Sequence, residues 1–204
     1  FTVIGAGVIS VIEYFYLRFG ESRGLSWLAS TFASKNPELF VDEEENSPEF
    51  VQELIESGEG EKLEFKSTLR VNLHTGERDE DVEHAVLKTI TAFLNTDGGT
   101  LLIGVSDDGE VTGIQKDEFG DNDKFYRHYS NLVRHHIDNK YLSLIQSNLI
   151  QMDGKHILKV DCRSSNEGVF LKVGDEQEFY VRTGPASVQL KGKKLVDYIN
   201  QKYK

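Results

Sequence analysis

Glu59, Glu64 and Asp107 are the acidic residues whose positions suggest a shared chemical site. Glu64 lies in a short predicted strand, and Asp107 follows an apolar run that predicts a second strand. If the two strands are neighbours, the carboxylates of Glu64 and Asp107 converge, and Glu59 reaches them from the preceding loop. Clustered carboxylates repel one another unless a cation neutralises them, so such a cluster predicts bound Mg²⁺ or Mn²⁺. The ion would polarise a phosphodiester and activate water while Lys66 holds a phosphate. The simpler alternative is a solvated acidic face, because the chain has 34 acidic residues.

The elements that must position these residues alternate between helical and strand patterns. The turn signals Asp108-Gly109 and Asp153-Gly154 each predict a hairpin. Mixed helices and hairpins predict an α+β fold, with a mixed, mostly antiparallel sheet and packed helices. The expected helices span residues 48–57, 79–95, 121–138 and 195–203, and the expected strands span 63–66, 100–105, 110–114, 142–152, 156–162, 169–173 and 178–183.

Charge is distributed unevenly along the 204 residues. The net charge is −11, and residues 1–64 hold 13 acidic residues against 4 basic ones, so the remainder is nearly neutral. This balance argues against indiscriminate nucleic-acid binding but leaves room for a local basic face. The single cysteine, Cys162, excludes an internal disulfide framework and a thiolate-rich zinc site. We expect it to pack in the core, and we expect a reducing, cytoplasmic location.

Three segments are predicted. Residues 1–22 form an apolar helix that is a candidate membrane anchor, residues 23–56 an acidic linker with short helices, and residues 57–204 a folded domain. Phe1–Phe19 is close to the length that spans a membrane, and Arg18 would tether the rest to the cytoplasmic face. Glu13 argues instead for an amphipathic or oligomer-forming helix. The only methionine is Met152, so we expect sequence upstream of Phe1.

Several motifs in the body occur in the order typical of one family. Together they resemble the Schlafen AlbA-type domain, and the resemblance covers about residues 57 to 203. The matching motifs are Glu59-x-Glu61-x-x-Glu64-Phe65-Lys66, Ala92-Phe93-Leu94-Asn95-Thr96-x-Gly98-Gly99, Leu101-Leu102-Ile103-Gly104-Val105, Asp117-x-Phe119, Phe170-Leu171-Lys172 and Phe179-Tyr180-Val181-Arg182-x-Gly184-Pro185.

The resemblance implies a nucleic-acid-binding domain of α+β type. In the branch that cuts transfer RNA, the family uses two glutamates five residues apart and a downstream aspartate, and Glu59, Glu64 and Asp107 occupy the matching positions. The resemblance thus assigns them catalytic and metal-binding roles. Animal Schlafens build their groove from two such lobes, so homodimerisation would supply the second lobe here. Older family labels mention ATP, but the chain has no Gly-x-x-x-x-Gly-Lys-Ser/Thr loop, so no ATP site is expected.

Candidate phosphate contacts are cations near aromatic residues or turns. In addition to Lys66, they are Arg127, Arg134, Arg182, Lys193 and Lys194. The helical arginines stand among His128, His135, Lys140, Tyr126 and Tyr129, and an ordinary exposed helix face is the alternative for that group. Arg182 either holds a phosphate or pins a strand end through an arginine–carboxylate pair. The six histidines lack the spacing of a zinc motif.

Three functions are compatible with these patterns. The first is a nucleic-acid-binding domain that acts as a metal-dependent endoribonuclease on structured RNA such as transfer RNA. The second is a non-catalytic DNA- or RNA-binding regulatory module, and the third is a membrane-tethered oligomerisation module. The carboxylate trio favours the first, whereas the acidic linker and Phe1–Phe19 favour the third.

Overall fold

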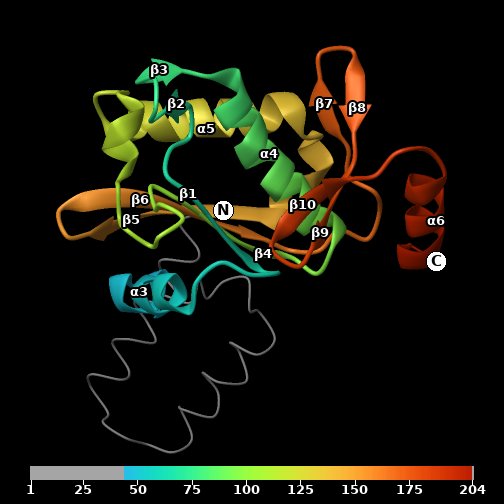
Figure 1. Ribbon diagram of the computed structural model, residues 1–204, viewed down its shortest axis with the longest axis horizontal. Helices are drawn as coiled ribbons and strands as arrows, with labels where there is room; N and C mark the ends of the chain where they lie inside the picture. The colour runs from blue at the N-terminus through green and yellow to red at the C-terminus, as the bar shows by residue number, and fades with distance from the viewer. Residues whose placement is uncertain (1–43, 204) are drawn as a thin grey trace, which may run out of the picture. The chain divides into compact units, whose positions relative to one another are not determined.

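A four-stranded sheet with the strand order β1-β4-β6-β5 forms the centre of the compact unit that begins at Asn46 (Figure 1). The computed structural model describes residues 44–203. β1 (Leu63–Lys66) lies parallel to β4 (Gly99–Ile103), and β4 lies antiparallel to β6 (Lys155–Cys162). β6 in turn lies antiparallel to β5 (Ile145–Met152). This mixed, mostly antiparallel sheet with its packed helices confirms the predicted α+β fold class.

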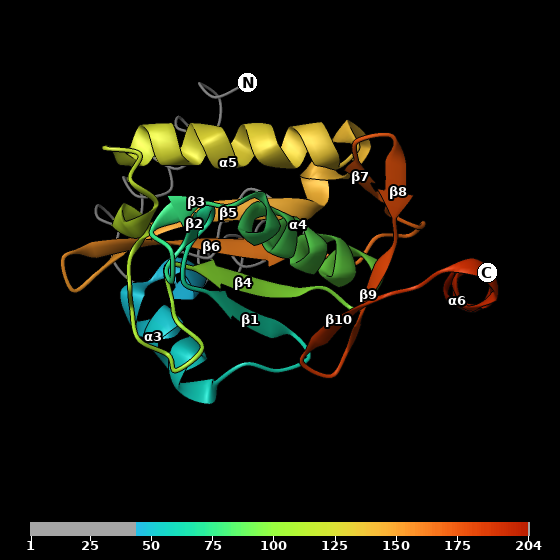
Figure 2. The same ribbon diagram turned by 45° about the horizontal axis from the view of Figure 1, so that its top comes forward.

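Helices cover both faces of the sheet. α4 (Glu80–Asn95) and α5 (Asn122–His136) pack on one face, and α3 (Pro48–Ser57) packs on the other (Figures 1 and 2). β4 is buried on both faces because Leu101 packs with α4 and α5 while its neighbour Leu102 packs with α3. A continuous apolar run is what a strand between two layers requires.

Side-chain caps fix the beginnings of α3 and α4. Ser47 accepts a hydrogen bond from the Phe50 N–H (3.1 Å), and Asp79 accepts one from the Asp81 N–H (2.9 Å). Both caps were expected from the sequence and are confirmed. α3 lies in the segment that the sequence assigned to the linker, yet its buried Val51 belongs to the core beneath the sheet.

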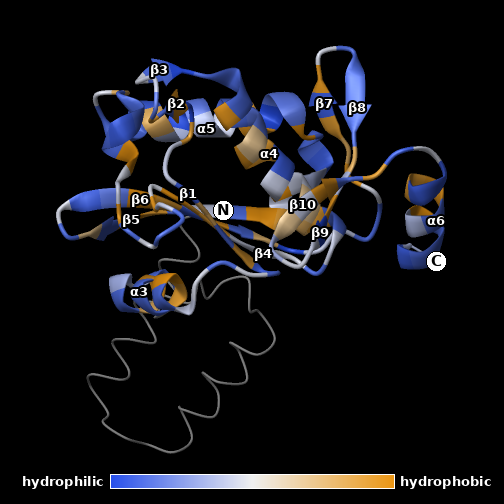
Figure 3. Ribbon diagram, in the orientation of Figure 1, coloured by the Kyte–Doolittle hydropathy of each residue, from blue (hydrophilic) through white to orange (hydrophobic). Residues whose placement is uncertain are grey.

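The remaining elements are short and join these layers. The Asp153-Gly154 turn between β5 and β6 is confirmed, and both residues have positive φ (50° and 76°). Figure 3 shows β8 as a hydrophilic strand on a projecting hairpin. The other elements are the 3₁₀ helices η2 (Glu44–Asn46), η3 (Ile114–Asp117) and η4 (Asn139–Leu144), the hairpins β2–β3 (Val71–Asn72, Glu77–Arg78), β7–β8 (Leu171–Val173, Glu176–Glu178) and β9–β10 (Tyr180–Thr183, Ala186–Gln189), and α6 (Gly192–Lys202).

Several elements differ from the sequence prediction, among them the short strands β2, β3 and β8, which were not predicted. The strand expected over 110–114 is reduced to a single bridge between Val105 and Val111, because the chain enters η3 directly afterwards. The first part of the strand expected over 142–152 is 3₁₀ helix. β10 was not predicted, because Gly184-Pro185 suggested the end of a strand and not the turn of a hairpin.

The apolar helix expected over residues 1–22, and with it the membrane tether through Phe1–Phe19, lies outside the described residues. Within residues 44–203, no helix combines the length and the apolar character needed to cross a membrane.

Candidate functional site

Glu59 lies at the outer edge of β1. Its Oε1 accepts a hydrogen bond from the Phe65 N–H (2.7 Å), and the neighbouring Gly60 N–H donates to the Leu63 carbonyl (2.9 Å). These two bonds satisfy backbone groups that would otherwise be open on an edge strand. The Glu59 carboxylate is therefore engaged with the backbone of its own sheet.

Glu64 lies in a cluster with Lys66 and Arg182. Lys66 Nζ is 2.5 Å from Glu64 Oε1, and Arg182 Nη1 is 2.8 Å from Glu64 Oε2. β1 positions both of its residues because its alternate residues Glu64 and Lys66 share the face opposite Leu63 and Phe65. Both Glu64 oxygens thus have a cationic partner.

Arg182 is the buried centre of this cluster. Its side chain is 1% exposed and donates to the carbonyls of Gly60 (2.6 Å) and Glu61 (3.3 Å) as well as to Glu64. Its guanidinium also lies 4.9 Å from the centre of the Phe93 ring. The arginine–carboxylate pair expected as one alternative is confirmed, and the guanidinium does not face a surface that a phosphate could reach.

Asp107 lies in an exposed turn beyond the end of β4. The two strands are neighbours, which meets the condition set by the sequence analysis, but the register places Glu64 opposite Leu101, six residues before Asp107. The three carboxylates therefore do not converge. In the part of the chain that the structure describes, no three His, Cys, Asp or Glu side chains are grouped so as to hold a metal ion. As they lie, Glu59, Glu64 and Asp107 do not fit Mg²⁺ or Mn²⁺.

The exposed face of α5 is close to electrically neutral. Arg127 forms an ion pair with Asp123, His128 lies 2.7 Å from Glu83, and the nearby Lys140 pairs with Glu167 (2.7 Å). Tyr129, expected beside these cations, is buried under the helix. Arg134 is exposed and has no ion-pair partner among residues 44–203. The ordinary helix face, given above as the alternative, describes most of this surface.

The start of α6 combines free cations with free backbone donors. Lys193 and Lys194 are exposed and form no ion pair with another described residue. The residue before the helix, Lys191, has no side-chain cap, so the first N–H groups of α6 lack the partner that a Ser or Asp would supply. A helix N-terminus carries partial positive charge, which the lysines reinforce. The β9–β10 hairpin delivers the chain to this point.

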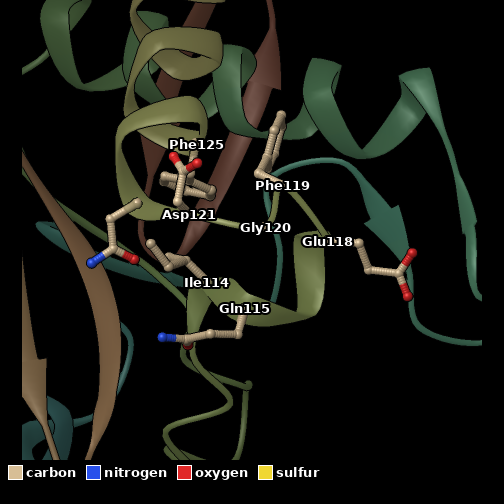
Figure 4. A pocket seen from close by; sticks show the side chains of 8 residues that line it. Ile114, Gln115, Glu118, Phe119, Gly120, Asp121 and Phe125 are labelled. Carbon is tan, nitrogen blue, oxygen red and sulfur yellow. The ribbon is translucent and has the colours of Figure 1, made fainter.

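Two pockets carry acidic residues that disfavour a phosphate. One, of about 330 Å³, lies between η3 and the start of α5 (Figure 4). Figure 4 shows the Asp121 carboxylate in front of Phe125, with Gln115 across the opening and Glu118 turned away. Its lining residues are Ile114, Gln115, Glu118, Phe119, Gly120, Asp121, Asn122 and Phe125.

The other pocket, of about 500 Å³, lies between α4, α5 and the β7–β8 hairpin and includes Glu80, Asp81, Glu83 and Glu178. Burial opposes ionisation of Glu178, but hydrogen bonds from His84 (2.6 Å) and Tyr180 (2.9 Å) lower its pKa below the usual value. Glu178 is therefore ionised at neutral pH, and a polyanion would be repelled here.

Two buried polar residues were not recognised from the sequence as organising groups. The Asn95 side chain donates to the carbonyls of Val169 (2.8 Å) and Tyr180 (2.9 Å) and accepts from the Val169 N–H (2.8 Å), so it ties the end of α4 to the chain before β7 and to β9. Asp117 accepts three backbone N–H bonds from the turn after β1. Both residues belong to the family motifs quoted above, and that membership was the only sign in the sequence that they have a structural role.

Comparison with known proteins gives a family match over most of this unit. The family model described as Schlafen, AlbA_2 matches residues 59–191. The crystal structure of the DIP2311 protein from Corynebacterium diphtheriae superposes with a TM-score of 0.50 at 14% identity, covering 71% of this chain and 24% of that chain, which indicates a shared fold. The N-terminal domain of a putative ATP-dependent DNA helicase RecG-related protein from Nitrosomonas europaea gives a TM-score of 0.45 at 21% identity, covering 72% of this chain and 94% of that chain. This chain thus spans about a quarter of the DIP2311 chain.

Proposed function

Because this chain belongs to the Schlafen, AlbA_2 family, whose model matches residues 59–191, we propose that its compact unit binds nucleic acid. The family match is the observation that carries the proposal. The chain is acidic overall, so binding must come from a local surface and not from the net charge.

We place that surface at the start of α6. Lys193 and Lys194 are free of ion pairs with the described residues. The uncapped N–H groups of the first turn of α6 point out along the helix axis, where they can donate to a phosphate. The other predicted contacts are less available: Lys66 and Arg127 are paired with carboxylates, and Arg182 is buried. Arg134 remains an exposed second candidate.

Binding without cleavage is the form of this function that we propose. Glu59 and Glu64 are engaged with the backbone and with cations, and Asp107 stands apart from them. A metal-dependent endoribonuclease acting on structured RNA, with its Mg²⁺ or Mn²⁺ ion, is the alternative that the incubation below tests. Homo-oligomer formation and membrane tethering stay predictions, and the binding measurement below compares DNA with RNA.

The Lys193→Gln/Lys194→Gln double variant should bind labelled nucleic acid about tenfold more weakly at low salt, because two phosphate contacts are lost. The slope of log affinity against log salt should fall by about 1–2. Fluorescence anisotropy with a structured RNA, single-stranded DNA and duplex DNA measures both quantities. Lys124→Gln/Lys140→Gln is the matched control, because it removes the same charge from lysines that are already paired.

Equal losses in the two double variants would assign the effect to net charge and reject the α6 surface. Failure of the unaltered chain to bind any of the three nucleic acids would reject the proposed function itself.

Incubation with transfer RNA and Mn²⁺ should leave the RNA intact, as should incubation with chelator. Gel electrophoresis of the end-labelled RNA checks this. Cleavage that requires Mn²⁺ and disappears in Asp107→Asn would restore the catalytic assignment. Asp107 is the right residue to test first, because it lies in an exposed turn and its replacement should leave the fold intact.

A further inference from the structure

The outer edge of β5 presents backbone groups in a regular row. β5 is the last strand of the sheet and pairs only with β6 among residues 44–203. The Arg163 N–H donates to the Leu144 carbonyl (2.9 Å), which fixes the alternation along β5. Ser147, Leu149 and Gln151 therefore direct their N–H and C=O groups away from β6. Within the described part of the chain, one bond reaches these groups, from the Tyr126 hydroxyl to the Ser147 carbonyl (3.3 Å).

The opposite edge of the sheet is built differently. β1 has four residues, two of them charged, and the Glu59 carboxylate and the Gly60 N–H cover its outer backbone groups. β5 has eight residues, without a charge and without proline. Proteins protect exposed edges with charges, prolines, short strands or covering groups, and β1 uses three of these devices while β5 uses almost none. This difference between the two edges indicates that the outer edge of β5 pairs with another strand.

We propose that β5 pairs antiparallel with β5 of a second copy of this chain, about a two-fold axis at Leu149. In this register Leu149 faces Leu149 of the other copy, Ser147 faces Gln151, and Asn148 faces Ile150. The apolar Leu149 side chains meet on the axis, the polar residues Ser147 and Gln151 are opposed, and no like charges face each other. The two four-stranded sheets become one continuous sheet.

The composition of β5 favours a second copy of this chain as the partner of its outer edge. A two-fold contact requires a surface complementary to itself, and an uncharged strand that can set Leu149 against Leu149 satisfies this without a separate partner. α5 runs along β5 (Figure 2), and its Tyr126 hydroxyl donates to the Ser147 carbonyl. A carbonyl oxygen has two lone pairs, so the Ser147 carbonyl can still accept a bond from a second strand. This inference does not depend on nucleic-acid binding by the same unit.

Sedimentation velocity of the full chain should show a monomer–dimer equilibrium over concentrations up to about 100 µM. Gln151→Pro should raise the dimer dissociation constant about tenfold or more, because it removes an outward N–H and leaves the β5–β6 ladder intact. Circular dichroism and cooperative urea unfolding verify that the variant remains folded. Gln151 is exposed at the end of the strand, so the substitution is well tolerated sterically.

Cysteine cross-linking tests the axis independently. Leu149→Cys should form a covalent dimer on mild oxidation, whereas Asn131→Cys, on the exposed face of α5, should not. The native Cys162 does not interfere, because it is buried and burial raises the pKa of its thiol.

Three outcomes would overturn the proposal. A chain that stays monomeric over the whole concentration range has no second copy on β5. Slow amide exchange at Ser147, Leu149 and Gln151 in such a monomer would assign the edge to another segment of the same chain. A dimer that forms equally well in folded Gln151→Pro uses a different surface.

Discussion

Replacing Arg182 with methionine should lower the free energy of unfolding by about 3 kcal/mol. The substitution removes the hydrogen-bond donor of the largely buried Glu64 carboxylate and of the carbonyls of Gly60 and Glu61. Arg182 is 1% exposed in its side chain, and Glu64, its partner, is 13% exposed. Methionine keeps the packing against Phe93 but supplies no donor for Glu64 or for the Gly60 carbonyl. Lys66 still pairs with Glu64, which limits the loss. Urea unfolding followed by circular dichroism measures the change.

Arg127→Met is the matched control for this experiment. Arg127 also pairs with a carboxylate, Asp123, but both side chains are mostly exposed. A surface pair contributes only about 0–1 kcal/mol, so the control should unfold close to the unaltered chain. A loss below about 1 kcal/mol in Arg182→Met would contradict the structural role assigned to the cluster.

The cluster also changes how a Glu64 variant must be interpreted. Glu64→Gln would weaken the bonds to Arg182 and Lys66, so lost activity in that variant could follow from altered structure and not from lost catalysis. A double-mutant cycle with Arg182→Met separates the two. Coupling of about 1 kcal/mol or more between the substitutions would show that Glu64 acts through Arg182.

The sequence was sufficient to predict the long helices and the strands of the central sheet, because their signals are local. Ser47 and Asp79 cap helices within three residues of themselves, and Asp153-Gly154 makes its turn from its own dihedral preferences. The strands 63–66 and 100–105 were also predicted, whereas their pairing was only assumed. The α+β class follows from these elements without knowledge of how they are paired.

The register and the side-chain partners were not predictable in the same way. The expected meeting of Glu64 and Asp107 required a register that the apolar pattern does not specify, and the actual register leaves them six residues out of line. Glu59 appeared to be a free carboxylate because its partner is a backbone N–H, which every residue except proline carries. The sequence could not decide whether Arg182 holds a phosphate or pairs with a carboxylate, because its partner Glu64 lies 118 residues away in the chain.

Asp117, the most deeply buried carboxylate among residues 44–203, organises the turn that follows β1. Its Oδ2 accepts from the Leu69 N–H (2.8 Å), and its Oδ1 accepts from the N–H groups of Arg70 (2.8 Å) and Val71 (3.1 Å). Burial raises the pKa of the Asp117 carboxyl, while the three N–H bonds and Arg70 oppose that rise. An amide at this position would place an NH₂ group against backbone donors.

Asp117→Asn should therefore lower the free energy of unfolding by about 2–4 kcal/mol, because at least one buried N–H loses its acceptor and the new NH₂ has none. Urea unfolding measures the loss, and amide exchange at Leu69, Arg70 and Val71 should accelerate relative to exchange in β4. Asp123→Asn makes the same chemical change on the exposed face of α5 and should stay within about 0.5 kcal/mol of the unaltered chain. If the three amides exchange as slowly in Asp117→Asn as in the unaltered chain, Asp117 does not hold this turn, and its burial must instead be maintained by the Arg70 guanidinium, which donates to the Asp117 carbonyl (2.8 Å).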